Sequence, residues 1–173
     1  MVNSIEIKRT TDIKDALAIH NVMLEAFNPY SAQYTEGALN ATIVSTQDME
    51  KRIASSDYEV LIAHYGNEIA GTASVIMEGE KNLYLCSMAV KPDYHGKGIG
   101  YRLLEEVEKI GRRKGCRTVS LETSAPLLNA KSLYEKFGFM IKGIRPHYYS
   151  DPQEDALVMW ASLKDCLQKM PHE

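Results

Sequence analysis

The chain has 173 residues, of which 45% are hydrophobic and 25% are charged, and its net charge at pH 7 is −3. This composition is typical of a globular protein that buries a core, and we expect a single domain over residues 1–173. It does not favour nucleic acid as a partner, because proteins that bind phosphate backbones are usually basic.

Nothing in the sequence is typical of secretion or of membrane insertion. Residues 1–10 lack the apolar run of a signal peptide, and no segment approaches the length of a membrane span. The three cysteines are widely spaced without a C-x-x-C motif, and the five histidines are scattered. We therefore expect a cytoplasmic protein with reduced thiols, without a metal site and without a membrane partner.

The first elements in chain order are a short strand around residues 5–8 and a helix. Thr11 or Asp12 is predicted to cap this helix, and Asn28-Pro29 is predicted to end it. The spacing of the apolar residues predicts a core-facing stripe made of Ile13, Leu17, Leu24 and Phe27. His20 lies on the same helix, and we expect it to be a hydrogen-bonded core residue.

The remaining chain predicts a mixed α/β sheet. A short helix is expected at residues 48–54, followed by three strands within 59–90, with turns at Gly66-Asn67 and Glu78-Gly79. The next predicted elements are a helix to about Lys114, a strand at 117–123, a helix at 129–137, and strands at 139–145 and 156–163. The sequence "PHYYSDPQED", residues 146–155, is predicted to connect the last two strands.

Three glycines, Gly96, Gly98 and Gly100, lie between a predicted strand and a predicted helix. Free N–H groups and the dipole of a helix N-terminus favour an anion at such a junction. The spacing G-x-G-x-G differs from the dinucleotide motif G-x-G-x-x-G. A P-loop needs Gly-Lys followed by Ser or Thr, whereas Gly98 is followed by Ile99. From these residues alone, a tight strand-to-helix connection without a ligand stays open.

The segment "SMAVKPDYHGKGIGYRLLEEVE" resembles the cofactor segment of the GNAT superfamily of N-acetyltransferases. The matching residues are Val90, Pro92, Gly96, Gly98, Ile99 and Gly100, whereas His95 stands where the family usually has Gln or Arg. A second segment, "NAKSLYEKFGF" at residues 129–139, resembles another motif of the family, although Leu127 replaces a frequent Asn. The resemblance implies the GNAT fold, a mixed and mostly antiparallel central sheet of six to seven strands flanked by about four helices.

The same resemblance implies acetyl-CoA as co-substrate. Backbone amides of the glycine loop would hold its pyrophosphate, and the strand before the loop would pair with its pantetheine. The implied cofactor-binding residues are Met88, Ala89, Val90, His95, Gly96, Lys97, Gly98, Ile99, Gly100, Tyr101, Asn129 and Tyr134. If the strand at 83–90 parts from its neighbour near the loop, the N–H of Met88 or Val90 could donate to the thioester oxygen.

A narrower resemblance connects the chain with protein N-terminal acetyltransferases, especially the ribosomal-protein alanine acetyltransferases. It is carried by Glu122, Tyr134, Arg145, Tyr148, Tyr149, Glu154, Asp155, Ala156 and Met159. Acetylation of an amine needs a base and a proton for the departing thiolate. We expect Glu122 to be the base and Tyr134 the acid, with a structural carboxylate and a core aromatic as the alternatives.

The acceptor is expected to be the α-amine of a protein or peptide, between walls formed by Tyr30, Tyr34, Tyr148 and Tyr149. Two alternatives remain, a small amine such as a polyamine, amino acid or aminoglycoside, and a CoA-binding regulatory domain without turnover. Either a monomer or a homodimer is compatible with the sequence.

Overall fold

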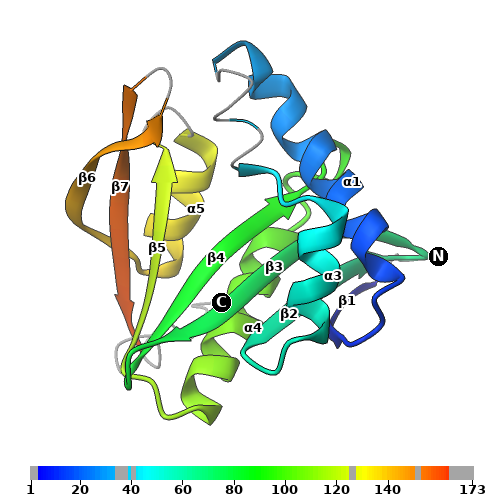
Figure 1. Ribbon diagram of the computed structural model, residues 1–173, viewed down its shortest axis with the longest axis horizontal. Helices are drawn as coiled ribbons and strands as arrows, with labels where there is room; N and C mark the ends of the chain where they lie inside the picture. The colour runs from blue at the N-terminus through cyan, green and yellow to red at the C-terminus, as the bar shows by residue number, and fades with distance from the viewer. Residues whose placement is uncertain (1–3, 34–38, 40–41, 125–127, 151–152, 164–173) are drawn as a thin grey trace, which may run out of the picture.

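One seven-stranded sheet forms the centre of the computed structural model, in the order β1-β2-β3-β4-β5-β7-β6 (Figure 1). The residues that the structure describes are 4–33, 39, 42–124, 128–150 and 153–163. The strands are β1 (Ile5–Thr10), β2 (Tyr58–Tyr65), β3 (Glu68–Glu78), β4 (Asn82–Val90), β5 (Thr118–Ser124), β6 (Met140–Ser150) and β7 (Gln153–Ser162). Neighbouring strands are antiparallel except β4 and β5, which confirms the predicted mixed, mostly antiparallel sheet.

Helices cover both faces of the sheet. Within the described ranges the α-helices are α1 (Asp15–Phe27), α3 (Thr46–Ala54), α4 (Ile99–Arg113) and α5 (Leu128–Phe137). Two 3₁₀ turns, η1 (Asn28–Gln33) and η2 (Pro92–Tyr94), follow α1 and β4. In the part of the chain that the structure describes, no helix is both long and apolar enough to cross a membrane.

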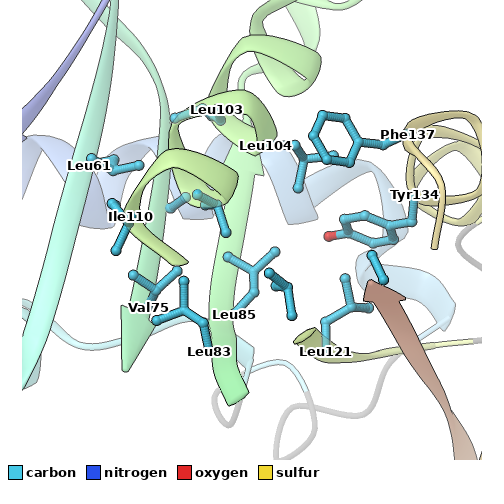
Figure 2. Close-up of a cluster of buried hydrophobic side chains, with 14 of the residues drawn as sticks. Leu61, Val75, Leu83, Leu85, Leu103, Leu104, Ile110, Leu121, Tyr134 and Phe137 are labelled. Carbon is cyan, nitrogen blue, oxygen red and sulfur yellow. The ribbon is translucent and has the colours of Figure 1, made fainter. Parts of the chain in front are cut away.

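Each face of the sheet has its own apolar core. One core joins α4 and α5 to the sheet and includes Leu83, Leu85, Leu103, Leu104, Leu121, Tyr134 and Phe137 (Figure 2). The other joins α1 and α3 to the opposite face and includes Ile19, Val22, Met23, Met49, Val60 and Ile62. Side chains alternate between the two cores along β2, as the period of a strand requires.

The first helix buries a face that differs from the predicted one. The side chains of Ile13, Leu17 and Leu24 are exposed, and only Phe27 of the predicted stripe is partly buried against the core. The buried residues of α1 are Ala16, Ile19, Val22, Met23 and Ala26. Both sets repeat with helical spacing, and small residues at both ends of the second set favour close packing on the sheet. The prediction of the core-facing stripe is therefore wrong.

Several predicted boundaries also change. The capping residue of α1 is Lys14, whereas Asp12 accepts the Lys14 N–H at 3.0 Å in the turn before the helix. α3 begins at Thr46, because the Ser45 hydroxyl accepts the Asp48 N–H at 3.1 Å and caps the helix. His20 is half-buried, and its Nδ1 donates to the Val44 carbonyl at 2.8 Å, so it is hydrogen-bonded as expected.

The predicted connection at 146–155 is largely strand. β6 continues to Ser150, and Tyr149 pairs with Glu154 on β7. An irregularity between Arg145 and Tyr149 takes in Pro146, which has no N–H to donate to a ladder. The proline therefore interrupts the pairing locally without ending the strand.

β4 and β5 are joined at one end only. Their pairing is limited to Asn82–Thr118, Leu83–Val119 and Tyr84–Ser120, and the strands diverge beyond it (Figure 1). The buried side chain of Asn82 crosses this join: it donates to the Ser120 hydroxyl at 2.7 Å and accepts from the Thr118 hydroxyl at 2.9 Å. The rest of β4 therefore has a free edge on the side of β5.

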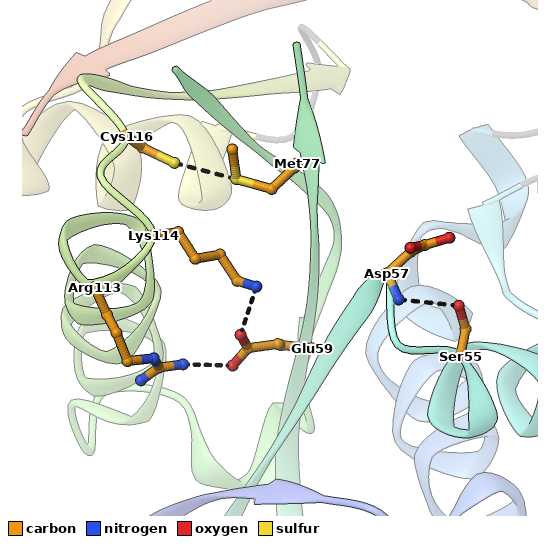
Figure 3. Close-up of polar contacts among 7 residues, drawn as sticks. All are labelled: Ser55, Asp57, Glu59, Met77, Arg113, Lys114 and Cys116. Carbon is orange, nitrogen blue, oxygen red and sulfur yellow. Dashed lines mark hydrogen bonds and ion pairs between the residues drawn. The ribbon is translucent and has the colours of Figure 1, made fainter. Parts of the chain in front are cut away.

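A buried carboxylate ties the end of α4 to β2. Glu59, only 5% exposed, accepts from Arg113 at 2.7 Å and from Lys114 at 3.0 Å (Figure 3). Burial alone would raise the pKa of the Glu59 carboxyl, but the hydrogen bonds and charges of Lys114 and Arg113 together outweigh it and lower the pKa. The contact fixes the helix whose other end carries the glycine loop.

Glu59→Gln is expected to lower the free energy of unfolding at pH 7 by about 2 kcal/mol, because two charge-assisted hydrogen bonds are lost. The pKa of Glu59 is lowered in the folded protein, so its stabilising contribution is fully present above pH 4.5, the ordinary pKa of a Glu side chain. The contribution is lost as the pH falls through the pKa of Glu59 in the folded protein. Urea titrations at pH 7 and in acid would measure both effects. Glu106→Gln, at an exposed pair with Lys109, is the control, and an equal loss in the two variants would contradict the prediction.

Candidate active site

The three glycines of the glycine loop have two different structural roles. Gly96 and Gly98 have φ angles of +74° and +83°, which disfavour residues with a side chain. A Cβ at either position would meet no atom within 4 Å, so the space outside them is open. Gly100 has an ordinary φ, but a Cβ there would lie 2.7 Å from Leu133 Cδ2 on α5. Two glycines shape the loop, and the third allows α4 and α5 to pack closely.

The backbone of the loop presents unpaired donors. The first hydrogen bond of α4 runs from the Arg102 N–H to the Gly98 carbonyl at 3.0 Å. The N–H groups of Ile99, Gly100 and Tyr101 therefore precede the helical ladder, at the positive end of the helix dipole. This is the geometry that binds an anion at a helix N-terminus.

Side chains around the loop hold it in place. His95 Nε2 donates to the Val90 carbonyl at 2.9 Å, which ties the loop to the end of β4. Lys97 Nζ lies 5.1 Å from the centre of the Tyr65 ring and 5.9 Å from that of Tyr94. Tyr101 packs edge-to-face on Phe137. Two aromatic rings therefore lie beside the positive charge of Lys97, which is itself part of the glycine loop.

The end of β4 turns two N–H groups toward its free edge. The Lys91 N–H donates to the Ala70 carbonyl of the β3 side at 2.9 Å. Because N–H groups alternate in direction along a strand, those of Val90 and Met88 point away from β3. They therefore face the region from which β5 has diverged.

Glu122 is a buried carboxylate on β5. Its side chain is 7% exposed, and Oε1 pairs with Nη2 of Arg145 on β6 at 3.0 Å. Among the described residues no group donates to Oε2, although this oxygen is buried. The preceding Leu121 belongs to the core beneath α4 and α5, so Glu122 faces the opposite side of the sheet.

Tyr134 lies on the other side of the sheet. Its ring is 8% exposed and packs edge-to-face on Phe139, and Figure 2 shows the hydroxyl pointing away from α5 toward the strands. Burial raises the pKa of the Tyr134 phenol to about 12, so the group is a proton donor throughout the physiological range. Glu122 and Tyr134 are therefore on opposite faces of the sheet.

The other predicted site residues are only partly described. Asn129 is exposed in the first turn of α5, and Tyr30 is half-buried in η1. Tyr148 and Tyr149 belong to β6, but their side chains, like the whole of Tyr34, lie outside the described part of the chain. Within that part, no three His, Cys, Asp or Glu side chains gather as metal ligands would.

One polar group that the sequence did not single out lies on the same face as Glu122. Arg52 of α3 extends over the sheet, and its Nη1 donates to the Ser87 hydroxyl of β4 at 3.3 Å. Beside Ser87, the Cys86 thiol is largely buried, which raises its pKa to about 11, while the positive charge of Arg52 acts in the opposite direction. Cys86 and Cys116 are free thiols, and Cys166 lies outside the described residues.

The sequence pattern of the acetyltransferase (GNAT) family matches residues 21–139, more than half of the chain. The chain belongs to the acetyltransferase (GNAT) family. This confirms the family that its two motifs resemble, and the sheet and helices described above are those of the GNAT fold.

Individual relatives of this GNAT protein are N-acetyltransferases by name. It is 37% identical over 81 residues to the putative [ribosomal protein bS18]-alanine N-acetyltransferase of Bacillus subtilis, covering 47% of this chain and 54% of that protein. It is 34% identical over 116 residues to the Escherichia coli K12 [ribosomal protein bS18]-alanine N-acetyltransferase, covering 64% and 77%. The chain thus spans about half the length of the Bacillus relative.

A solved structure extends the similarity over the whole domain. The PaiA N-acetyltransferase of Thermoplasma acidophilum, in complex with coenzyme A, superimposes with a TM-score of 0.77 at 25% identity. The superposition covers 92% of this chain and 99% of that protein. The likeness in fold therefore extends beyond the matched family segment.

Proposed function

We propose that this GNAT protein is an acetyl-CoA-dependent N-acetyltransferase that acts on the α-amine of a protein or peptide N-terminus. The observation that carries the proposal is the Glu122 carboxylate, which is buried, held by Arg145, and without a described donor on Oε2. A buried oxygen without a donor is costly, and an amine supplies the missing N–H group. The names of the Bacillus subtilis and Escherichia coli relatives support a protein N-terminus as the acceptor.

The residues around the loop fit acetyl-CoA, which supplies an acetyl group activated as a thioester. The free N–H groups at the start of α4 suit its pyrophosphate, and the open space outside Gly96 and Gly98 permits close approach. Met88, Ala89 and Val90 would bind along the free edge of β4. Since Ala89 and Ile99 are buried, they would contribute through their backbone. His95, Lys97, Tyr101, Asn129 and Tyr134 complete the proposed set.

Gly98→Val is expected to weaken acetyl-CoA binding by about tenfold or more, because the side chain would enter the space outside the loop and remove the close approach. It also strains a backbone at φ +83°. Gly79→Val is a matched control, since Gly79 has φ +68° and equally open surroundings in the β3–β4 turn. Calorimetric titration should show lost affinity in the first variant only. Parental affinity in Gly98→Val would disprove the assignment of the loop.

The proposed chemistry divides between the two faces of the sheet. Glu122 would accept a proton from the amine, directly or through water, while Arg145 holds Oε1 and leaves Oε2 for the acceptor. The N–H of Met88 or Val90 would donate to the thioester oxygen. Tyr134 would supply a proton to the departing thiolate from the opposite side.

An α-amine suits this arrangement better than a lysine side chain. The pKa of an α-amine is about 8, against about 10.4 for lysine, so a single carboxylate deprotonates the α-amine at a lower free-energy cost. For the walls of the acceptor site we retain Tyr30 and Tyr34 from one segment and Tyr148 and Tyr149 from β6. Rings with a hydroxyl suit a peptide end, which offers amides as well as an amine.

A competition experiment tests the acceptor. Short peptides with free α-amines are mixed with spermidine, lysine and an aminoglycoside at equal concentrations, and the products are measured by mass spectrometry. Peptides should react fastest. Tyr149→Ala should lower their kcat/KM by a factor that corresponds to about 1–3 kcal/mol of transition-state stabilisation, while the affinity for acetyl-CoA stays unchanged. Faster turnover of any small amine than of every peptide would replace this proposal with a small-amine acetyltransferase.

A further inference from the structure

Resting on the proposed function, we further propose that Arg52 forms a subsite for a carboxylate of the acceptor. N-termini with an acidic side chain close to the α-amine would then be the preferred substrates. The proposal depends on the position of Arg52, on its unpaired charge and on its relation to Glu122.

The Arg52 side chain is half-buried between α3 and the sheet. Its guanidinium carbon lies 5.3 Å from the centre of the Tyr58 ring, and Nη1 donates to the Ser87 hydroxyl at 3.3 Å. An aromatic face on one side and a strand on the other restrict the planar group to one orientation. A guanidinium fixed in this way is preorganised for a planar partner.

Arg52 forms no ion pair with a described residue, and its positive charge acts on the Asp48 carboxyl only as the smallest of the effects on the pKa of that group. The adjacent Lys51 pairs with Asp48 Oδ1 at 2.8 Å, and Ser45 donates to Asp48 Oδ2 at 3.0 Å, so both oxygens of this acid are engaged by other groups. Arg52 itself makes one hydrogen bond, to a neutral hydroxyl. A guanidinium has five N–H donors, and a carboxylate that accepts two of them is its best match.

A hollow in this face gives a ligand access to Arg52. It has a volume of about 670 Å³ and is lined by Val44, Ser45, Arg52 and Tyr58 among others. Ligand pockets of about 300–1,000 Å³ hold groups of drug-like size, so this hollow can accommodate one or two amino-acid side chains. Its lining also includes Asp48 and Lys51, which pair with each other, so Arg52 is the cation of this lining that has no ion pair.

The hollow and the candidate base are on the same face of the sheet. Cys86 connects them, because both the positive charge of Arg52 and the negative charge of Glu122 act on the pKa of its thiol, Arg52 lowering it and Glu122, like Glu78, raising it. β4, which carries Cys86 and Ser87, neighbours β5, which carries Glu122, but the two strands are paired only as far as Tyr84 and Ser120 and diverge beyond. An acceptor with its amine at Glu122 therefore reaches Arg52 by extending a nearby side chain across this opening.

The charges on this face also select against cationic acceptors. Arg52 and Arg145 both lie on this face with Glu122, so an amine with an adjacent acid is favoured over a polyamine. The subsite thus specifies the acceptor more narrowly than the α-amine alone.

The test uses the full chain and three pairs of alanine-initiated peptides, which carry either Glu or Gln at the second, third or fourth residue. For at least one position, the parent should acetylate the Glu peptide with a kcat/KM about tenfold higher than its Gln counterpart. Arg52→Gln should abolish this preference. Lys51→Gln should keep it, because Lys51 is exposed and engaged with Asp48.

The outcomes separate this subsite from the function on which it rests. Equal rates for all Glu and Gln pairs in the parent, or an unchanged preference in Arg52→Gln, would overturn the subsite while leaving peptide acetylation intact. If no peptide is acetylated but a small amine is, the proposed function fails and the subsite fails with it. Thermal unfolding of Arg52→Gln shows whether a lost preference comes from loss of the fold. Tyr58→Leu is a second variant, which removes the ring beside the guanidinium and keeps Arg52 itself.

Discussion

Replacing Glu122 by glutamine is expected to lower kcat/KM by about 10²-fold or more, the usual contribution of a general base. Glutamine keeps the shape of the side chain, and its carbonyl oxygen can still accept from Arg145. It cannot take a proton from the acceptor amine, however. The loss should therefore appear in turnover, while the affinity for acetyl-CoA, which binds around a different set of residues, stays at the parental value.

A control for Glu122→Gln is available on α4. Glu108 is 17% exposed and pairs with Arg112 at 2.6 Å, so it too is a largely buried carboxylate held by an arginine, but its partner lies on the same helix. Glu108→Gln should leave kcat/KM nearly unchanged. Steady-state rates with a peptide that has a free α-amine, together with urea unfolding of both variants, measure activity and stability separately. Near-parental activity in Glu122→Gln would reduce Glu122 to a structural role.

Tyr134→Phe is expected to lower kcat by about 10²-fold, because the departing thiolate loses its proton donor. The affinity for acetyl-CoA should change little, since phenylalanine preserves the packing against Phe139 and the surrounding core. With the pKa of the phenol at about 12, ionisation of Tyr134 should not limit the parent at any pH near neutrality.

The control for this variant is Tyr65→Phe, at a ring that packs edge-to-face on Tyr94 and against the same core. Stopped-flow measurements of thiol release separate the chemical step from binding. A decrease in acetyl-CoA affinity with unchanged kcat would assign Tyr134 to cofactor binding instead. A decrease of the same size in Tyr65→Phe would indicate a general effect on the core.

The sequence predicts the elements around the glycine loop well, because local chemistry determines them. Gly66, Gly79, Gly98 and Gly115 all have a positive φ, and each marks a turn or a helix end at or near its predicted place. Such positions depend on the conformational freedom of a single residue. The junction between β4 and α4 could therefore be predicted from the local sequence, without knowledge of any distant contact.

The face of α1 could not be predicted, because two apolar stripes share one helix. Ile13, Leu17 and Leu24 repeat as regularly as Ile19, Val22 and Met23, and only the docking of α1 onto the sheet distinguishes them. Periodicity detects an amphipathic helix, but it does not rank two overlapping stripes.

The contacts of the candidate site depend on tertiary structure in the same way. Short sequence motifs predict Glu122 and Tyr134 as candidate site residues. The pairing of Glu122 with Arg145 is not predictable in this way, because it requires β6 to fold back beside β7. Arg52 carries no local signal at all, since its partners Tyr58 and Ser87 come from two strands.

The join between β4 and β5 also determines which face of the sheet receives the candidate base. A shift of β5 by one residue would turn each of its side chains to the other face. Leu121 would leave the core, and Glu122 would enter it as an ion among apolar groups. The same shift would turn Ser120 and Thr118 away from Asn82, whose buried side chain would keep only its hydrogen bond to Glu78. Two penalties at different points of the strand therefore oppose the same error, and they add to the alignment that the β5–β7 ladder imposes.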